Sequence, residues 1–231
     1  MKDGKTKKTP LPVRLFTVLL ICAVDLAWTA FWIYRWSHHG TLISVRNASE
    51  DAAGIFRQSL ILCVIPVLTA AVYFLILKKD FASETALRVA GRKQWAFVGA
   101  PALVLFIMAL AALLIKADKI SVLYALLYYT VFVALTEEFL IRGACVFLLK
   151  EENAWIRYLI PNLLFAAMHV FAYGGWGEIT AGYVVHFLTS QLLGTAVIGC
   201  IFQYLKEKTG TLWVPILIHA IMDFSGVFLY A

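Results

Sequence analysis

Long apolar runs, separated by short polar segments, dominate this sequence. A helix needs roughly 20 apolar residues to cross the hydrocarbon core of a bilayer, and about seven runs approach or exceed that length. Runs of this length are typical of helices, which pair their own backbone polar groups within lipid. The sequence therefore predicts an all-α fold, a polytopic transmembrane helix bundle of about seven spans. The predicted spans are Val13–Trp36, Ser59–Leu77, Trp95–Ile115, Val122–Leu149, Ala154–Tyr173, Ala181–Leu205 and Thr211–Tyr230.

The composition excludes an ordinary soluble domain. Hydrophobic residues make up 62% and charged residues 15% of the 231 residues, and the mean hydropathy is +0.82. Soluble domains average about 45–50% apolar and about 25% charged residues. The net charge of +6 does not indicate a nucleic-acid partner, because most Lys and Arg residues lie in the short segments between apolar runs. We therefore expect an integral membrane protein that contacts membrane lipid and binds no nucleic acid.

The distribution of Lys and Arg predicts the orientation. These residues are concentrated in the N-terminal segment, in the segment between the second and third spans, and at every second segment thereafter. Such a bias is typical of the cytoplasmic side of a membrane protein. The first apolar run is longer than the core of a cleaved signal peptide, which has about 7–15 residues. We expect an uncleaved first helix and a cytoplasmic N-terminus.

Strongly polar residues lie within the later spans, where they are costly. Insertion scales assign roughly 2.5–3.5 kcal/mol to an Arg or Asp at the centre of a membrane helix. Several such residues in one bundle must therefore pair with each other or line a wet cavity. We interpret His186 and Gln191 of the sixth span as structural, together with Asp25, which lies in the first span. The others are Glu137, Glu138, Arg142, His169, His219 and Asp223.

Three helices place an acid and two imidazoles at similar depth. At about 1.5 Å per residue, Glu137, His169 and His219 lie roughly 16–20 Å from the basic residue near the cytoplasmic end of each span. Glu138 and Arg142 are four residues apart and share a helix face, whereas Glu137 is rotated by about 100°. The Glu138–Arg142 pair could simply fix helix packing, and a lone membrane histidine is more often a hydrogen-bond partner than a catalyst. Together, however, these groups could activate water.

Three motifs resemble those of a known family. The sequence contains EEFLIR at Glu137–Arg142, FAAMH at Phe165–His169 and HAIMD at His219–Asp223. The pattern resembles the CAAX protease and bacteriocin-processing family of intramembrane peptidases, also described as the Abi family, with its EExxxR, FxxxH and HxxxN or HxxxD motifs. The resemblance covers about residues 121–230. Residues 95–231 would then hold a transmembrane helix plus the catalytic core, and residues 1–94 a cytoplasmic tail, two transmembrane helices and a cytoplasmic loop.

The resemblance implies a glutamate-dependent intramembrane endopeptidase, a CAAX prenyl protease-like hydrolase. Its substrate would be a membrane-associated protein or peptide precursor. The glutamate-dependent mechanism implies no cofactor and no metal, and the sequence lacks the HExxH zinc spacing. Three of the site residues could nevertheless hold a metal in principle, namely Glu137, His169 and His219. The resemblance implies that Glu137 and His169 activate water, that His219 and Asp223 stabilise the oxyanion, and that Glu138, Arg142 and Phe165 support the site.

One position departs from the prenyl-protein members of the family. Asp223 stands where they have Asn, and an ionised carboxylate would repel an oxyanion. Asp223 would therefore be protonated, or would orient His219 instead. This departure indicates that the chain is not a true CAAX enzyme, and the short chain and cation layout fit a bacterial member in the plasma membrane.

Two other classes of protein stay open. One is a non-catalytic membrane scaffold or bacteriocin-immunity protein that retains the polar core of the family. The other is a proton-coupled transporter, because membrane Glu and His residues can form a proton relay. The sequence has no repeated halves and no paired Gly/Pro-broken helices, which transporters often show.

Overall fold

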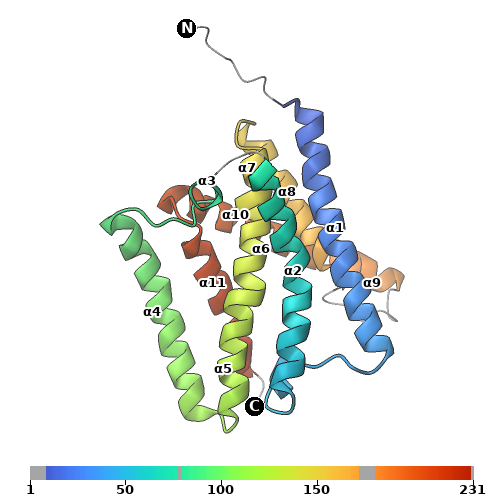
Figure 1. Cartoon of the computed structure of the whole chain (residues 1–231), viewed down its shortest axis with the longest axis vertical. Coiled ribbons are helices and arrows are strands. Elements are labelled where there is room, and N and C mark those ends of the chain that lie inside the picture. The colour runs from blue at the N-terminus through green and yellow to red at the C-terminus, as the bar shows by residue number, and fades with distance from the viewer. Residues whose placement is uncertain (1–8, 77–79, 172–179, 230–231) are drawn as a thin grey trace.

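The computed structural model describes residues 9–76, 80–171 and 180–229, and every regular element in these ranges is helical (Figure 1). The predicted all-α fold is confirmed. The elements are α1 (Leu11–His38), η1 (Val45–Asn47), α2 (Ala52–Ile76), α3 (Phe81–Glu84), α4 (Arg92–Ile115), α5 (Lys119–Leu127), η2 (Tyr128–Leu135), α6 (Thr136–Glu138), η3 (Phe139–Cys145), α7 (Val146–Leu148), α8 (Ala154–Met168), η4 (His169–Phe171), α9 (Ala181–His186), η5 (Phe187–Gln191), α10 (Leu192–Thr209), α11 (Trp213–Phe224) and α12 (Gly226–Leu229).

Length and apolar composition make this bundle an integral membrane domain. Four helical segments of the described chain are long and apolar enough to cross a bilayer. Two further apolar helical segments are shorter, namely α8 and the stretch Trp213–Phe228 that begins with α11. The number of about seven spans stays a prediction, as does the side of the membrane on which the N-terminus lies. The predicted span ends Leu77, Tyr173 and Tyr230 lie outside the described residues. The four long segments are Leu11–His38, Ala52–Val72, Arg92–Ile115 and Ala181–Thr209.

A single continuous helical stretch, from α5 through η2, α6 and η3 to α7, runs through the centre of the bundle (Figure 1). Asp118 caps its start by accepting a hydrogen bond from the backbone N–H of Ser121. Both η2 and η3 have the wider π-helical turn, which occurs often at functional sites. Every residue from 138 to 149 is buried. The EExxxR motif therefore lies in the most enclosed helix of the molecule.

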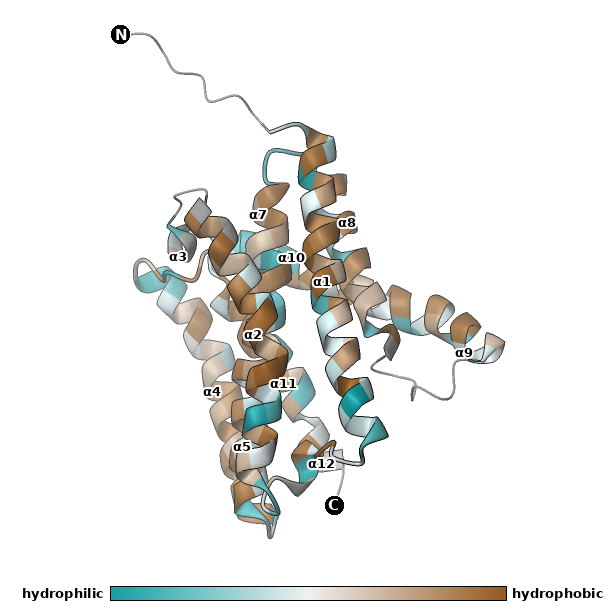
Figure 2. Ribbon diagram, turned by 45° about the vertical axis from the view of Figure 1, so that its right-hand side comes forward, coloured by the Kyte–Doolittle hydropathy of each residue, from teal (hydrophilic) through white to brown (hydrophobic). Residues whose placement is uncertain are grey.

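Two apolar clusters hold this central stretch in place. One joins it to α2, α4 and α11 through side chains that include Phe74, Ala109 and Ile216. The other joins it to α1 and α8 through side chains that include Ile21 and Phe165. Large apolar side chains on the outer faces of the helices are exposed, as a lipid-facing surface requires, and Figure 2 shows that apolar residues dominate the long helices. The polar site thus forms where α1, α8 and α11 meet the central stretch.

Some helix boundaries differ from the predicted spans. The regular α-helix of α8 ends at Met168, so His169 lies at its C-cap rather than within a longer span. The last span is broken at Ser225 between α11 and α12. His186, which we expected to be buried, is exposed on α9, an element that projects from the bundle (Figure 2). The start of α1 and the short helix α12 lie at opposite ends of the molecule (Figure 2).

Candidate active site

The polar core begins with a fully buried ion pair. Arg142 Nη1 donates a hydrogen bond to Glu138 Oε1 at 3.0 Å, and both side chains are 0% exposed. The two residues are four positions apart, as the sequence predicts for one helix face. A charge removed from solvent must be paired, because its desolvation otherwise costs several kcal/mol. Removal of either residue would therefore leave the other as an unpaired buried charge.

Helices α8 and α10 complete the surroundings of Arg142. Its Nη2 donates to Asn162 Oδ1 of α8 at 2.8 Å, and its guanidinium carbon lies 4.4 Å from the centre of the Phe165 ring. Asn162 in turn donates through Nδ2 to the carbonyl of Tyr158 at 2.7 Å. Lys206 of α10 donates to the backbone carbonyl of Arg142. These contacts fix η3 against its two neighbours.

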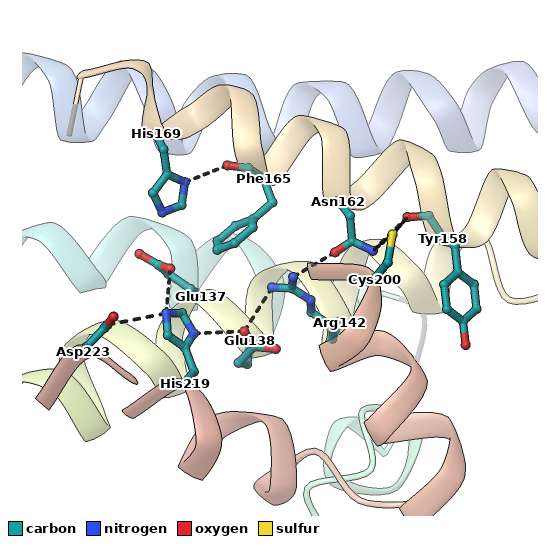
Figure 3. Close-up of polar contacts among 10 residues, drawn as sticks. All are labelled: Glu137, Glu138, Arg142, Tyr158, Asn162, Phe165, His169, Cys200, His219 and Asp223. Atoms are coloured by element: carbon teal, nitrogen blue, oxygen red, sulfur yellow. Dashed lines mark hydrogen bonds and ion pairs between the residues drawn. The ribbon is translucent and has the colours of Figure 1, made fainter. Parts of the chain in front are cut away.

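His219 of α11 links this buried pair to the other acids. Its Nδ1 lies 3.0 Å from Glu138 Oε1, and its Nε2 lies 3.4 Å from Asp223 Oδ2 and 3.8 Å from Glu137 Oε2. Figure 3 shows the imidazole between the three carboxylates. Because a carboxylate only accepts, Nδ1 is the donor to an ionised Glu138. Glu138 therefore orients His219 so that Nε2 faces Glu137 and Asp223.

His169 approaches the site from the end of α8. Its Nδ1 lies 2.8 Å from the carbonyl oxygen of Phe165, which can only accept, so Nδ1 is the donor. The ring also packs edge-on against the Phe165 ring, with centroids 4.6 Å apart. In the neutral imidazole, Nε2 is then the nitrogen that can accept a proton. Figure 3 shows the ring on the side of Phe165 that faces Glu137.

Glu137 and His169 line a cavity of about 180 Å³ between α1, α8 and the central stretch. The Glu137 side chain is 34% exposed, in contrast to Glu138, and its Oε2 has no hydrogen-bond partner among the described residues. Asp25 and Thr29 of α1 also line the cavity. The remaining walls are apolar, and they consist of Leu26, Ala30, Ile33, Leu140, Ile141, Phe165 and Met168.

The structure thus brings together the side chains that the motifs singled out, and their catalytic roles stay predictions. Sequence reasoning missed Asn162, which lies three and seven residues before Phe165 and His169 and so shares their helix face. It also missed the backbone contact of Lys206. Asp25, which we interpreted as structural, faces the same cavity as Glu137. Asp25 is the only carboxylate of α1, and this was the available signal.

No group of three or more His, Cys, Asp or Glu side chains in the described part of the chain is arranged to hold a metal ion. The His219 imidazole is occupied on both sides by carboxylates at 3.0 and 3.4 Å. His169 uses Nδ1 for the Phe165 carbonyl, and its side chain lines the cavity.

Residues 119–225 match the family model described as Type II CAAX prenyl endopeptidase Rce1-like. This segment is Rce1-like. The match confirms the resemblance and supports a CAAX-type intramembrane protease, and it is consistent with the wider CAAX protease and bacteriocin-processing family. No curated protein and no solved structure matches the chain significantly. The Rce1-like segment includes all three motifs, and it leaves α1, α2 and α4 outside.

Proposed function

We propose that the chain is a glutamate-dependent intramembrane endopeptidase, with Glu137 as the general base. The observation that carries this proposal is the difference between two adjacent carboxylates. Glu138 is enclosed and bonded to Arg142 and His219, whereas Glu137 lines a cavity opposite His169. A general base must reach the proton that it takes, so only Glu137 is placed to act on a bound water.

The attacking water would lie between Glu137 and His169. Its two O–H groups would donate to the Glu137 carboxylate and to Nε2 of His169, which the Phe165 carbonyl holds in the required tautomer. This arrangement would direct an oxygen lone pair toward the scissile carbonyl. As the oxygen–carbon bond forms, the proton would pass from water to Glu137.

The oxyanion of the tetrahedral intermediate would form beside His219. With Nδ1 bonded to Glu138, a doubly protonated His219 would donate through Nε2 to the oxyanion. Asp223 Oδ2 lies 3.4 Å from the same nitrogen, so it would hold the ring and balance its charge. This assigns Asp223 the orienting role rather than direct contact with the oxyanion.

We propose a membrane-associated protein or peptide precursor as substrate. The cavity walls are mostly apolar, and the outer faces of the surrounding helices are exposed apolar surfaces that lipid would cover. A peptide segment that enters such a site from the membrane buries apolar side chains, which favours binding. The name of the matched family suggests prenylated substrates for its members.

The test compares membrane proteomes of cells that carry the wild-type chain, Glu137→Gln or Glu84→Gln at matched expression. Glu84 is a matched control, because it is a glutamate outside the site that pairs with Lys150. We expect one or a few proteins to accumulate uncleaved with Glu137→Gln and not with Glu84→Gln. Full cleavage by Glu137→Gln would contradict the proposal. No difference between any of the strains, with folded protein and an intact phenotype, would favour a non-catalytic scaffold or immunity protein.

A further inference from the structure

Asp25 belongs to the inner face of α1. Val18, Ile21 and Cys22 are buried, and Asp25 follows them at the spacing that continues the same helical face. Thr29, one turn further along, lines the cavity together with Asp25. The inner face of α1 thus presents two polar side chains where the helix reaches the cavity, beside apolar ones. A lone carboxylate in an apolar membrane helix is costly and often marks a functional site.

Contacts on both sides of Asp25 hold α1 in place, against the Rce1-like segment before it and against α2 after it. Before Asp25, the three buried side chains pack against Leu140, Ile141 and Cys145 of η3. Arg14, near the start of α1, pairs with Glu152 between α7 and α8. After Asp25, the Trp28 indole donates to the Ile61 carbonyl of α2 at 2.7 Å. The position of Asp25 relative to Glu137 is therefore fixed by packing.

Hydrolysis of an amide also requires a proton for the leaving nitrogen, which can come from the base that took the proton of the water or from a second acid. The amine leaves the tetrahedral intermediate readily only if its nitrogen is protonated as the C–N bond breaks. Glu137 takes one proton from water, while His219 is held by Glu138 and Asp223 at the oxyanion. Asp25 lines the same cavity as Glu137, and two carboxyl groups that share a largely apolar cavity repel each other when both are ionised.

We propose that Asp25 is the general acid that protonates the leaving amine, so that α1 completes the active site of the Rce1-like segment. In this step Asp25 gives its proton to the nitrogen, the C–N bond breaks, and the new carboxylic acid forms on the other fragment. Glu137 then passes the proton that it took from water to Asp25. The sum is one water consumed and one amide bond cleaved, with both carboxyl groups restored. This inference rests on the proposed peptidase function.

The experiment compares two leaving groups with the full chain reconstituted in lipid vesicles. One probe is a peptide that spans a cleavage site found in the proteome comparison, and the other carries a thioester in place of the scissile amide. A thiol has a pKa of about 8.5, so a thiolate leaves without a proton. We expect Asp25→Asn to lower kcat for the amide by about 100-fold, the lower range for general acid catalysis, with little change for the thioester. Asp25→Glu should recover part of the amide activity.

Cys22→Ala provides the control for packing, because Cys22 lies one turn earlier on the same buried face of α1. It should change cleavage of both probes by the same factor. An equal loss on both probes with Asp25→Asn would show a structural role and overturn the proposal, as would undiminished amide cleavage. Failure of the peptidase function itself would look different: the wild-type chain would cleave neither probe, or Glu137→Gln would cleave both at the wild-type rate.

Discussion

Two adjacent glutamates of one helix occupy opposite environments. Glu138 is 0% exposed and receives contacts from Arg142 and His219, whereas Glu137 is 34% exposed and faces a cavity. A rotation of about 100° per residue is sufficient to separate them. The first carboxylate is enclosed by protein on every side, and the second remains accessible to a bound molecule.

We infer from these two environments that Glu138 supports the site, whereas Glu137 takes part in its chemistry. Glu138 joins three helices, because Arg142 beside it reaches Asn162 on α8 while His219 comes from α11. Glu138 Oε2 and Arg142 Nε have no hydrogen-bond partner among the described residues, but the network of contacts between the helices restricts the groups that make them. Glu137, which is outside the network, is then held by its backbone at a fixed distance from His219. A substitution in the network should therefore affect stability, and a substitution at Glu137 should affect catalysis.

The largest expected effect on stability is that of Arg142→Met. Methionine fills much of the volume but leaves the buried Glu138 without its cationic partner. Breaking a buried ion pair by removing one member costs about 3–5 kcal/mol. Thermal unfolding in detergent, or denaturant titration where it is reversible, would measure the loss. Glu137→Gln, measured in parallel, should unfold close to the wild type. Similar losses of stability in the two variants would contradict the inference that Arg142 supports the fold while Glu137 does not.

Asn162→Ala should have the next largest effect. It removes the acceptor of the 2.8 Å hydrogen bond from Arg142 Nη2. Hydrogen bonds to charged groups contribute about 1.5–3 kcal/mol, so the free energy of unfolding should fall by that amount. Leu163→Ala is the control, since Leu163 is the next residue of α8 and is exposed on its outer face. An unchanged unfolding midpoint for Asn162→Ala would show that the hydrogen bond between Arg142 and α8 does not stabilise the fold.

Gly199→Ala tests how closely α10 approaches the network. A Cβ atom at Gly199 would lie 2.5 Å from Arg142 Nη2 and 2.5 Å from Asn162 Oδ1. Overpacking of this kind costs about 1–3 kcal/mol. Gly194→Ala on the same helix is the matched control, because no atom would lie within 4 Å of its new Cβ. Alanine is the better helix former by about 1 kcal/mol, so Gly194→Ala should be neutral or stabilising. A stable Gly199→Ala chain would argue against the close approach.

Periodicity and polarity made much of this arrangement predictable. The apolar runs predicted the long helices, and the spacing of Glu138 and Arg142 predicted their ion pair, because both depend on local helical geometry. Glu137 and His219 were expected at one depth, and they lie 3.8 Å apart. The catalytic roles themselves stay predictions, since the contacts place these side chains without testing what they do.

Contacts between distant segments were not predictable in the same way. The partner of Arg142 on α8 depends on how two helices cross, which a single sequence does not specify. The π-helical turns of η2 and η3 have no clear local signal, and they depend on packing around the central stretch. The position of Asp25 in the cavity similarly depends on how α1 packs against the bundle. The sequence does not specify this packing, and we therefore interpreted Asp25 as structural.

Asp118 is a carboxylate outside both the buried ion pair and the cavity. Its substitution should have the smallest effect on stability. It is exposed at the start of α5, where hydrogen bonds from Ser121 and then Ser49 lower its pKa to about 2. Because the pKa is below the ordinary value of 3.8, its contribution to stability is present above that pH and is lost as the pH falls through about 2. Asp118→Ala should cost about 1 kcal/mol at neutral pH, as the loss of an N-cap does, with full peptidase activity.

Unfolding midpoints of the wild type and Asp118→Ala at several pH values would check this. The two midpoints should differ at neutral pH and converge below about pH 2, where the wild-type Asp118 is protonated too. A difference that persists at low pH would mean that the side chain contributes through packing rather than charge. Asp118 receives hydrogen bonds from Ser121 and Ser49 at the surface, whereas Glu138 is enclosed in the bundle and contacts Arg142 and His219. Loss of peptidase activity in Asp118→Ala would extend the supporting network beyond the buried pair to the end of the central stretch.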